Sequence, residues 1–157
     1  MKTLKILFAL CIMLGFAASA DSQGNGKQVK KPLKGSFYAW VVEEYPTTEV
    51  MSIIGNATHL GNVKGSIMTL VRPTPPPPLV ATFSGILMAA NGDYVNFNGY
   101  SNMTITAPPA SGTMVGKIFI TGGTGRFSGC TGEADLVGIF DMVASCTSYS
   151  IDGTITY

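Results

Sequence analysis

The sequence predicts an all-β protein built as a closed antiparallel barrel of about eight strands, with a β-sandwich as the alternative. From Gly35 onward, apolar residues recur at every second position, which is the period of a strand with one buried face. Turn residues separate these stretches, and the chain contains 19 glycines and 9 prolines. No window of ten or more residues forms a convincing amphipathic helix. A closed barrel is favoured because it leaves no sheet edge exposed in a chain that is only 12% charged.

Residues 1–20 have the pattern of a secretory signal peptide. Two lysines precede a short apolar run from Ile6 to Leu14, and the small residues Ala18 and Ala20 precede the expected cleavage point. This apolar run is shorter than the ~20 residues that a membrane-spanning helix needs. We therefore expect an exported protein, secreted or periplasmic, that has no membrane span.

Residues 21–34 are polar and contain four lysines. We expect them to form a flexible basic segment, followed by the barrel domain at residues 35–157. Removal of residues 1–20 takes away two lysines and no acid, and leaves 8 basic and 9 acidic side chains. A balance this close to neutral gives no reason to expect nucleic acid or anionic lipid as a partner.

Eight strands are expected in the barrel domain. They are Ser36–Val42, a short one at Glu49–Ile54, Thr58–Val71, Leu79–Ala89, Asp93–Thr106, Thr113–Thr121, Glu133–Asp141 and Thr147–Tyr157. The period is clearest in the last strand, where Tyr149, Ile151 and Ile155 fall on one face and serine and threonine on the other. The Asn91-Gly92 pair predicts a tight hairpin turn between the fourth and fifth strands.

Three further segments are expected to connect strands. Residues 72–78 contain five prolines and predict a polyproline II loop, and residues 107–110 predict a shorter loop of the same kind. Residues 122–132 are rich in glycine but lack the motifs of phosphate-binding loops. We expect a structural turn there, in which Phe127 plugs the barrel end and Arg126 donates hydrogen bonds to loop carbonyls.

Three segments in this order, Gly55–Gly61, Ala89–Asp93 and Gly122–Gly132, resemble a family of small secreted bacterial proteins of unknown function. Within the last segment, Gly-Gly-Thr-Gly-Arg-Phe also resembles the plant allene oxide cyclase and dirigent proteins. That resemblance implies an eight-stranded antiparallel barrel with an apolar cavity. None of the plant enzymes' catalytic positions matches a residue here, so the resemblance does not imply their activity.

The chain offers few groups for acid–base chemistry, and we assign no catalytic residue. His59 is the only histidine, so the sequence predicts no metal site built on several histidines. A Ser-His-Asp triad would have no second histidine to draw on. Glu43 and Glu44 are neighbours in a strand and point to opposite sides, so at most one can face a cavity. No metal and no cofactor is expected.

Five residues are candidate ligand contacts: His59, Arg126, Trp40, Tyr94 and Tyr100. The histidine and the arginine can orient a ligand by hydrogen bonds, and the aromatic rings can line a ligand mouth. Each also has a structural alternative, because a histidine at a strand start can bond to backbone and aromatic residues in strands commonly serve packing.

Cys130 and Cys146 are the only cysteines outside residues 1–20, and an even count in an exported protein favours a disulfide. If Glu133–Asp141 is one strand, however, its ends lie about 30 Å apart at ~3.3 Å per residue. A disulfide joins Cα atoms only ~4.4–6.8 Å apart. The two arguments conflict, and the sequence leaves the disulfide open.

Three functions are compatible with these features. A secreted, non-catalytic barrel that binds a small apolar molecule or a surface partner is favoured, because candidates for catalysis are scarce and such a barrel can enclose a cavity. The first alternative is a cyclase-like or isomerase-like enzyme, which needs a polar residue such as His59 or an inward glutamate at the cavity floor. The second is a structural component of the envelope or matrix. The oligomeric state is not predicted.

Overall fold

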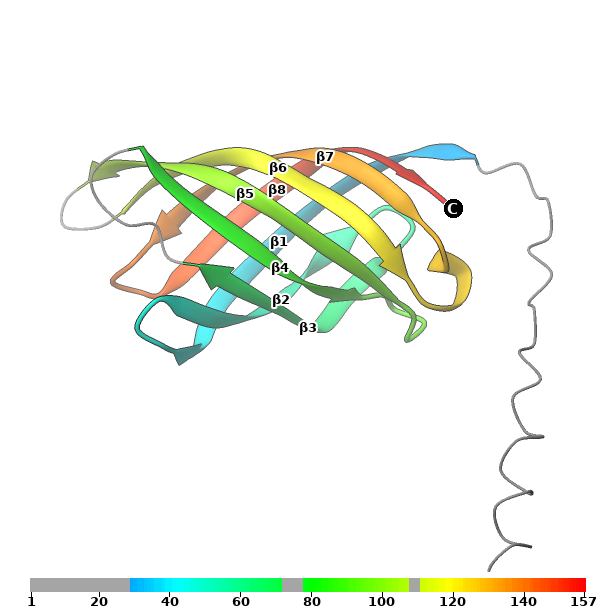
Figure 1. Ribbon diagram of the computed structural model, residues 1–157, viewed down its shortest axis with the longest axis horizontal. Coiled ribbons are helices and arrows are strands. Elements are labelled where there is room, and N and C mark those ends of the chain that lie inside the picture. The colour runs from blue at the N-terminus through cyan, green and yellow to red at the C-terminus, as the bar shows by residue number, and fades with distance from the viewer. Residues whose placement is uncertain (1–28, 72–77, 108–110) are drawn as a thin grey trace, which may run out of the picture.

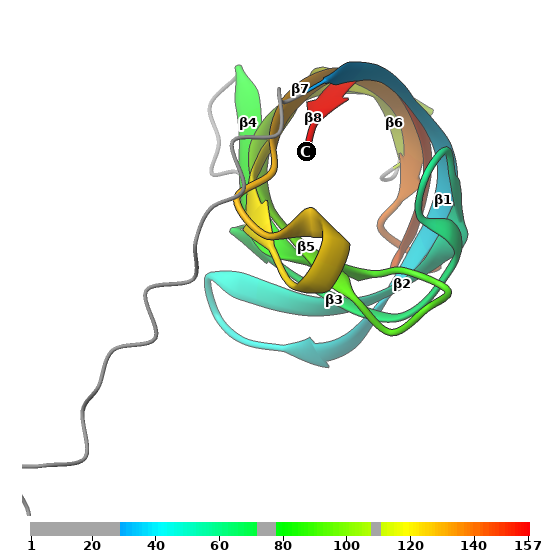
Figure 2. The ribbon, with the colours of Figure 1, turned by 90° about the vertical axis from the view of Figure 1, so that its right-hand side faces the viewer.

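The computed structural model describes residues 29–71, 78–107 and 111–157 as one antiparallel sheet that closes on itself. Its strands are β1 (Lys30–Glu44), β2 (Thr48–Ala57), β3 (Gly61–Val71), β4 (Leu79–Met88), β5 (Tyr94–Ala107), β6 (Ser111–Gly123), β7 (Thr131–Asp141) and β8 (Cys146–Thr156). Each strand pairs with the next, and β1 pairs with β8. Figure 2 shows the resulting ring. The predicted barrel is therefore confirmed over the sandwich.

Strand β1 begins earlier than predicted. Residues 30–34 belong to it, although the sequence assigned them to a flexible segment, because they pair with the end of β8 from Asp152 to Thr156. Leu33 explains the difference, since this side chain lies inside the barrel and is only 2% exposed. One buried leucine among lysines is too weak a pattern to be recognised as a strand. The predicted signal peptide at residues 1–20 lies outside the described residues.

Strand β3 begins later than predicted. It starts at Gly61, because Thr58, His59 and Leu60 form the turn that follows β2. His59 adopts a positive φ of 68°, a left-handed conformation that residues other than glycine rarely adopt in a strand. The predicted hairpin turn at Asn91-Gly92 is confirmed between β4 and β5, where Gly92 has a φ of 89°.

The barrel has two different ends (Figure 1). We call one the closed end; it holds the β2–β3, β4–β5 and β6–β7 turns and the last residues of β8. The other, which we call the mouth, holds the β1–β2 and β7–β8 turns, at the left of Figure 1. The strand ends that lead into residues 72–77 and 108–110 also reach the mouth. Most of the two predicted proline loops lies outside the described residues.

The glycine-rich turn between β6 and β7 seals the closed end, as predicted. It contains a short 3-10 helix, η1 (Gly125–Phe127), whose Phe127 is completely buried. The ring of Phe127 packs edge-on against Tyr157, with centroids 5.3 Å apart. Arg126 donates from its guanidinium to the carbonyl oxygen of His59 and so ties this turn to the β2–β3 turn.

The interior of the closed half is filled by apolar side chains. The strands alternate so that one continuous buried cluster forms, which includes Leu33, Ile53, Leu60, Val63, Leu87, Val95, Ile118, Phe127 and Ile155. Two aromatic pairs also lie in this interior: Phe37 stacks on Tyr149 at 5.3 Å, and Phe83 lies 6.2 Å from Phe97. Within the described part of the chain, no helix is long and apolar enough to cross a membrane.

Candidate functional site

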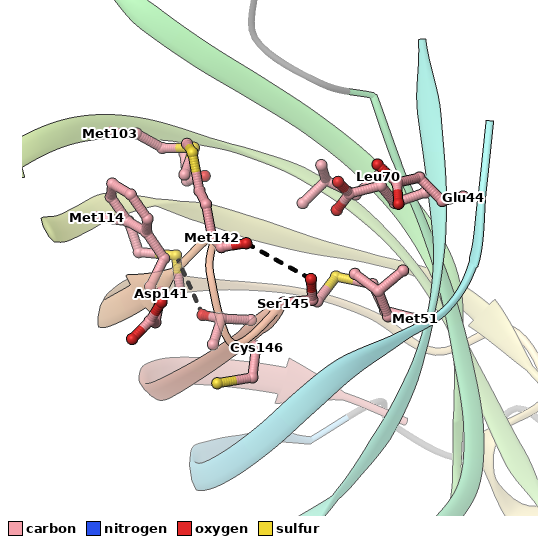
Figure 3. A pocket seen from close by; sticks show the side chains of 14 residues that line it. Glu44, Met51, Leu70, Met103, Met114, Asp141, Met142, Ser145 and Cys146 are labelled. Carbon is pink, nitrogen blue, oxygen red and sulfur yellow. Dashed lines mark hydrogen bonds between the residues drawn. The ribbon is translucent and has the colours of Figure 1, made fainter. Parts of the chain in front are cut away.

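A cavity of about 300 Å³ opens at the mouth of the barrel (Figure 3). Its volume is at the lower end of the roughly 300–1,000 Å³ that ligand pockets occupy. The apolar part of its lining comes from six strands and the β7–β8 turn, and consists of Val41, Met51, Leu70, Met103, Met114, Phe140 and Met142. The cavity is therefore a mainly apolar site that opens at one end of the barrel.

Small residues on neighbouring strands explain why this part of the barrel is hollow. Ser101 on β5 lines the cavity, and its partners across the sheet are Ala81 on β4 and Gly116 on β6. A Cβ atom at Gly116 would lie 1.9 Å from the carbonyl oxygen of Tyr100, so no side chain fits there without a backbone shift. Three adjacent strands thus contribute almost no side-chain volume at this level.

Methionines give the cavity an adaptable wall. Met51, Met103, Met114 and Met142 come from four different segments of the chain and all line it (Figure 3). Methionine is unbranched and polarisable, so it adjusts to apolar surfaces of different shapes. Met142 is 44% exposed and stands at the rim, whereas Met51 is only 3% exposed. This wall therefore suits apolar ligands and can adapt to more than one ligand shape.

Carboxylates stand at the cavity rim. A register shift between Val41 and Glu43 turns Glu44 inward, directly opposite Glu49 of β2. Glu43 accepts a hydrogen bond from the Tyr45 hydroxyl at 2.6 Å and does not line the cavity, so only one of the two neighbouring glutamates faces inward, as the sequence predicted. Glu44 and Glu49 both take part in polar interactions of their own.

Asp141, the third rim carboxylate, has a structural role. Its Oδ1 accepts hydrogen bonds from the backbone N–H groups of Val143 and Ala144, each at 2.9 Å, and so holds the β7–β8 turn in place. None of the described lining residues is basic. Within the described residues, no group of three or more His, Cys, Asp or Glu side chains is arranged to hold a metal ion.

None of the five predicted ligand contacts lines the cavity. Trp40 faces away from the interior and stacks on Tyr38 at 5.9 Å, and Tyr100 faces outward beside Phe119 at 6.5 Å. Tyr94 also alternates with the buried positions of β5. The structure thus places these three rings on the outer surface.

His59 and Arg126 lie together at the closed end. The Nε2 atom of His59 is 3.1 Å from the carbonyl oxygen of Pro32, and its ring meets Tyr157 edge-on at 5.8 Å. The Arg126 guanidinium lies 4.7 Å from the ring centroid of Phe127. Both side chains therefore take part in holding the closed end together.

The possible disulfide is corrected, because Cys130 and Cys146 are both free thiols. They flank the two ends of β7, so the length of that strand keeps them apart, as one of the two sequence arguments required. Cys130 is completely buried, and desolvation raises the pKa of its thiol. Cys146 is half-buried beside the mouth.

The residues that form the cavity were not among the predicted contacts. Met51, Met103 and Met114 occupy inward positions near the mouth ends of their strands. The alternation along each predicted strand indicates part of this, since it places these methionines on the opposite face from their outward-facing neighbours. The missing information was which end of the barrel stays open.

No protein-family model matches the chain, and no curated protein matches it. Among solved structures, the pterocarpan synthase dirigent protein GePTS1 aligns at 17% sequence identity with a TM-score of 0.54. The alignment covers 88% of this chain and 94% of that protein. The pterocarpan synthase dirigent protein PsPTS1 aligns at 16% identity with a TM-score of 0.48, over 82% of this chain and 95% of that one. The likeness to GePTS1 shows that the chain has the closed eight-stranded barrel fold of a dirigent protein.

Proposed function

We propose that this protein is an exported, non-catalytic barrel that binds a small apolar molecule in the mouth cavity. The observation that carries the proposal is a cavity of about 300 Å³ with seven apolar side chains in its wall. Transfer of apolar surface from water into such a wall contributes roughly 25 cal/mol per Å². Export is proposed from the signal-peptide pattern of residues 1–20.

The arrangement of the two ends supports a single route for the ligand. Phe127 is completely buried at the closed end, and the buried cluster extends from there into the barrel. The polar groups that an enzyme-like mechanism would need at the cavity floor lie elsewhere, since His59 belongs to the closed end and the inward Glu44 stands at the rim. A ligand would therefore enter and leave at the mouth, and the site holds it by shape and apolar contact.

The test is a titration of residues 21–157 with 1,6-diphenylhexatriene, a hydrocarbon that becomes fluorescent in apolar surroundings. Leu70→Trp places a large ring in the cavity wall, and we expect it to weaken binding at least about tenfold, which corresponds to ~1.4 kcal/mol. Val115→Trp is the matched control, because Val115 points outward from β6 and is 52% exposed. It should change the affinity by less than about twofold, since it leaves the cavity intact.

Absence of fluorescence enhancement with the unmodified protein would overturn the proposal. Equal weakening by the two variants would also count against it, because the dye would then occupy the outer surface. That result would favour a surface partner, for which the outward-facing Tyr38 and Trp40 pair on β1 is the natural contact.

A further inference from the structure

We infer that the ligand carries one neutral hydrogen-bonding group, which meets the hydroxyl of Ser101, while the rest of the molecule is apolar. A neutral alcohol should then bind better than the carboxylate or the amine of the same chain length. This inference rests on the proposed function and adds the chemical class of the ligand and a residue that selects it.

Among the described residues that line the cavity, Ser101 is the polar side chain for which the structure shows no hydrogen-bond partner. It lies on the inward face of β5, lines the cavity and is only 2% exposed. Its hydroxyl makes no hydrogen bond to any residue that the structure describes. No fully enclosed side-chain oxygen or nitrogen in that part of the chain lacks a partner, so the Ser101 oxygen must open onto the cavity. A buried hydroxyl without a partner is unfavourable, and a ligand group can supply the missing bond.

The space in front of Ser101 is kept free by its neighbours. Ala81 and Gly116 are its partners on the adjacent strands, and neither has a side chain long enough to cover the hydroxyl. Gly116 cannot be replaced by a larger residue without backbone movement. The sheet therefore leaves room for a few ligand atoms beside this hydroxyl.

The other hydroxyls of the cavity are already engaged. Thr147 is 7% exposed, donates to the carbonyl oxygen of Ile139 at 3.0 Å, and lies 3.6 Å from the sulfur of Met114. The Ser145 hydroxyl lies 3.5 Å from the carbonyl oxygen of Met142 at the rim. Ser101 is therefore the group inside the cavity that remains to select a ligand.

Electrostatics favour a neutral head group over a charged one. A carboxylate beside Ser101 would lose its hydration, and no described lining residue carries a positive charge to compensate. Its approach would also pass the carboxylate of Asp141 at the rim. An ammonium group is attracted to that rim, but at the level of Ser101 it would meet one hydroxyl and methionine sulfurs in place of water.

The test is displacement of bound diphenylhexatriene at pH 7 by octan-1-ol, octanoate and octylamine, three probes that share one apolar chain. We expect octan-1-ol to displace the dye at a concentration about tenfold lower than either charged probe. Ser101→Ala should weaken octan-1-ol by about three- to tenfold, the effect of one lost hydrogen bond. The affinity for the hydrocarbon dye should stay unchanged.

Two further variants complete the experiment. Ser148→Ala removes an exposed serine from the outer face of β8 and should leave all three probes unaffected. Ser101→Thr keeps the hydroxyl and should preserve the preference for the alcohol even if the added methyl group lowers every affinity. Thermal unfolding of each variant confirms that the barrel is intact.

The outcomes separate this inference from the proposed function. If the dye and all three probes fail to bind, the proposed function is wrong. If the probes bind without distinction between head groups, or if Ser101→Ala leaves octan-1-ol unaffected, the inference is wrong and the binding function stands. Tighter binding of octylamine than of octan-1-ol would show that the acidic rim selects the ligand, and would also overturn the inference.

Discussion

Tyr149 is an ionisable residue buried inside the barrel. It is the next inward residue of β8 after Thr147, and its ring stacks on Phe37. Burial raises the pKa of its hydroxyl far above the ordinary value of 10.0, because the phenolate would lose its hydration inside an apolar cluster. The folded state therefore requires the neutral form of this side chain.

This burial makes stability depend on alkaline pH. The pKa of Tyr149 is higher in the folded than in the unfolded chain, so the stabilisation is complete below pH ~10 and is lost as pH rises above it. The free energy of unfolding should fall by up to about 1.4 kcal/mol per pH unit in that range. We expect Tyr149→Phe to remove this part of the slope, measured by urea unfolding between pH 8 and 11.

The control is Tyr100→Phe, because Tyr100 lies on the outer face and is 37% exposed. Both variants retain Cys130, whose raised pKa contributes its own alkaline slope. The difference between the two variants therefore compares a buried tyrosine with one on the outer face. Identical slopes would contradict the assignment of Tyr149 as a buried neutral phenol.

Single residues also show what alternation can and cannot predict. The period of β5 already separates Tyr94 and Tyr100 from the buried Val95 and Phe97, so the outward orientation of these tyrosines follows from the sequence. The left-handed turn at His59 does not follow, because a histidine at positive φ has no local sequence signal. The role of Ser101 in the cavity could not be predicted either, because it depends on the small residues Ala81 and Gly116 on the neighbouring strands.

At the level of elements, the pairing between β3 and β4 differs from the other seven strand pairings. Its paired residues run only from Ile67–Ile86 to Val71–Thr82, the shortest register in the barrel. A register shift in the β2–β3 pairing, with Gly65 at a φ of 67°, bends β3 away beyond this point. The backbone N–H of Met88 then donates to the side chain of Ser66 at 2.8 Å instead of to a strand carbonyl.

Short pairing predicts local opening. We expect backbone amides of β3 and β4 to exchange with deuterium before those of β6 and β7, because fewer ladder hydrogen bonds must break to expose them. Hydrogen exchange followed by mass spectrometry of peptides from the native protein measures the order. Earlier exchange of β6 and β7 would show that the β3–β4 pairing is not the weakest.

Element boundaries were predictable where turn residues mark them. The Asn91-Gly92 turn and the glycine-rich Gly122–Gly132 segment set the limits of four strands correctly to within a few residues. The start of β1 was not predictable, because residues 30–34 become a strand only by pairing with β8, at the other end of the chain. Long-range pairing of this kind leaves little local pattern.

For the whole molecule, the important feature is that the first and last strands complete the ring. β1 and β8 are paired from Lys30–Thr156 to Trp40–Cys146. The first and last residues of the barrel strands therefore lie side by side at the closed end. Closure could be predicted from the need to protect strand edges in a chain of low charge. The open mouth could not, since it depends on how the turns at the two ends fill the interior.

Adjacent ends predict that the barrel tolerates a circular permutation. A short glycine–serine linker from Tyr157 to Lys30 would join paired strands, and new ends between Asn91 and Gly92 would fall in an exposed turn. We expect this permutant to unfold cooperatively within about 5 °C of the parent protein. It should also bind diphenylhexatriene with the parent affinity, because the new ends lie at the closed end and the cavity lies at the mouth.

A second permutant, opened between Leu136 and Val137 inside β7, should fail to fold, since its new ends interrupt pairing with both β6 and β8. Loss of cooperative unfolding in the first permutant would mean that the β4–β5 hairpin, and not closure by β1 and β8, holds the ring together.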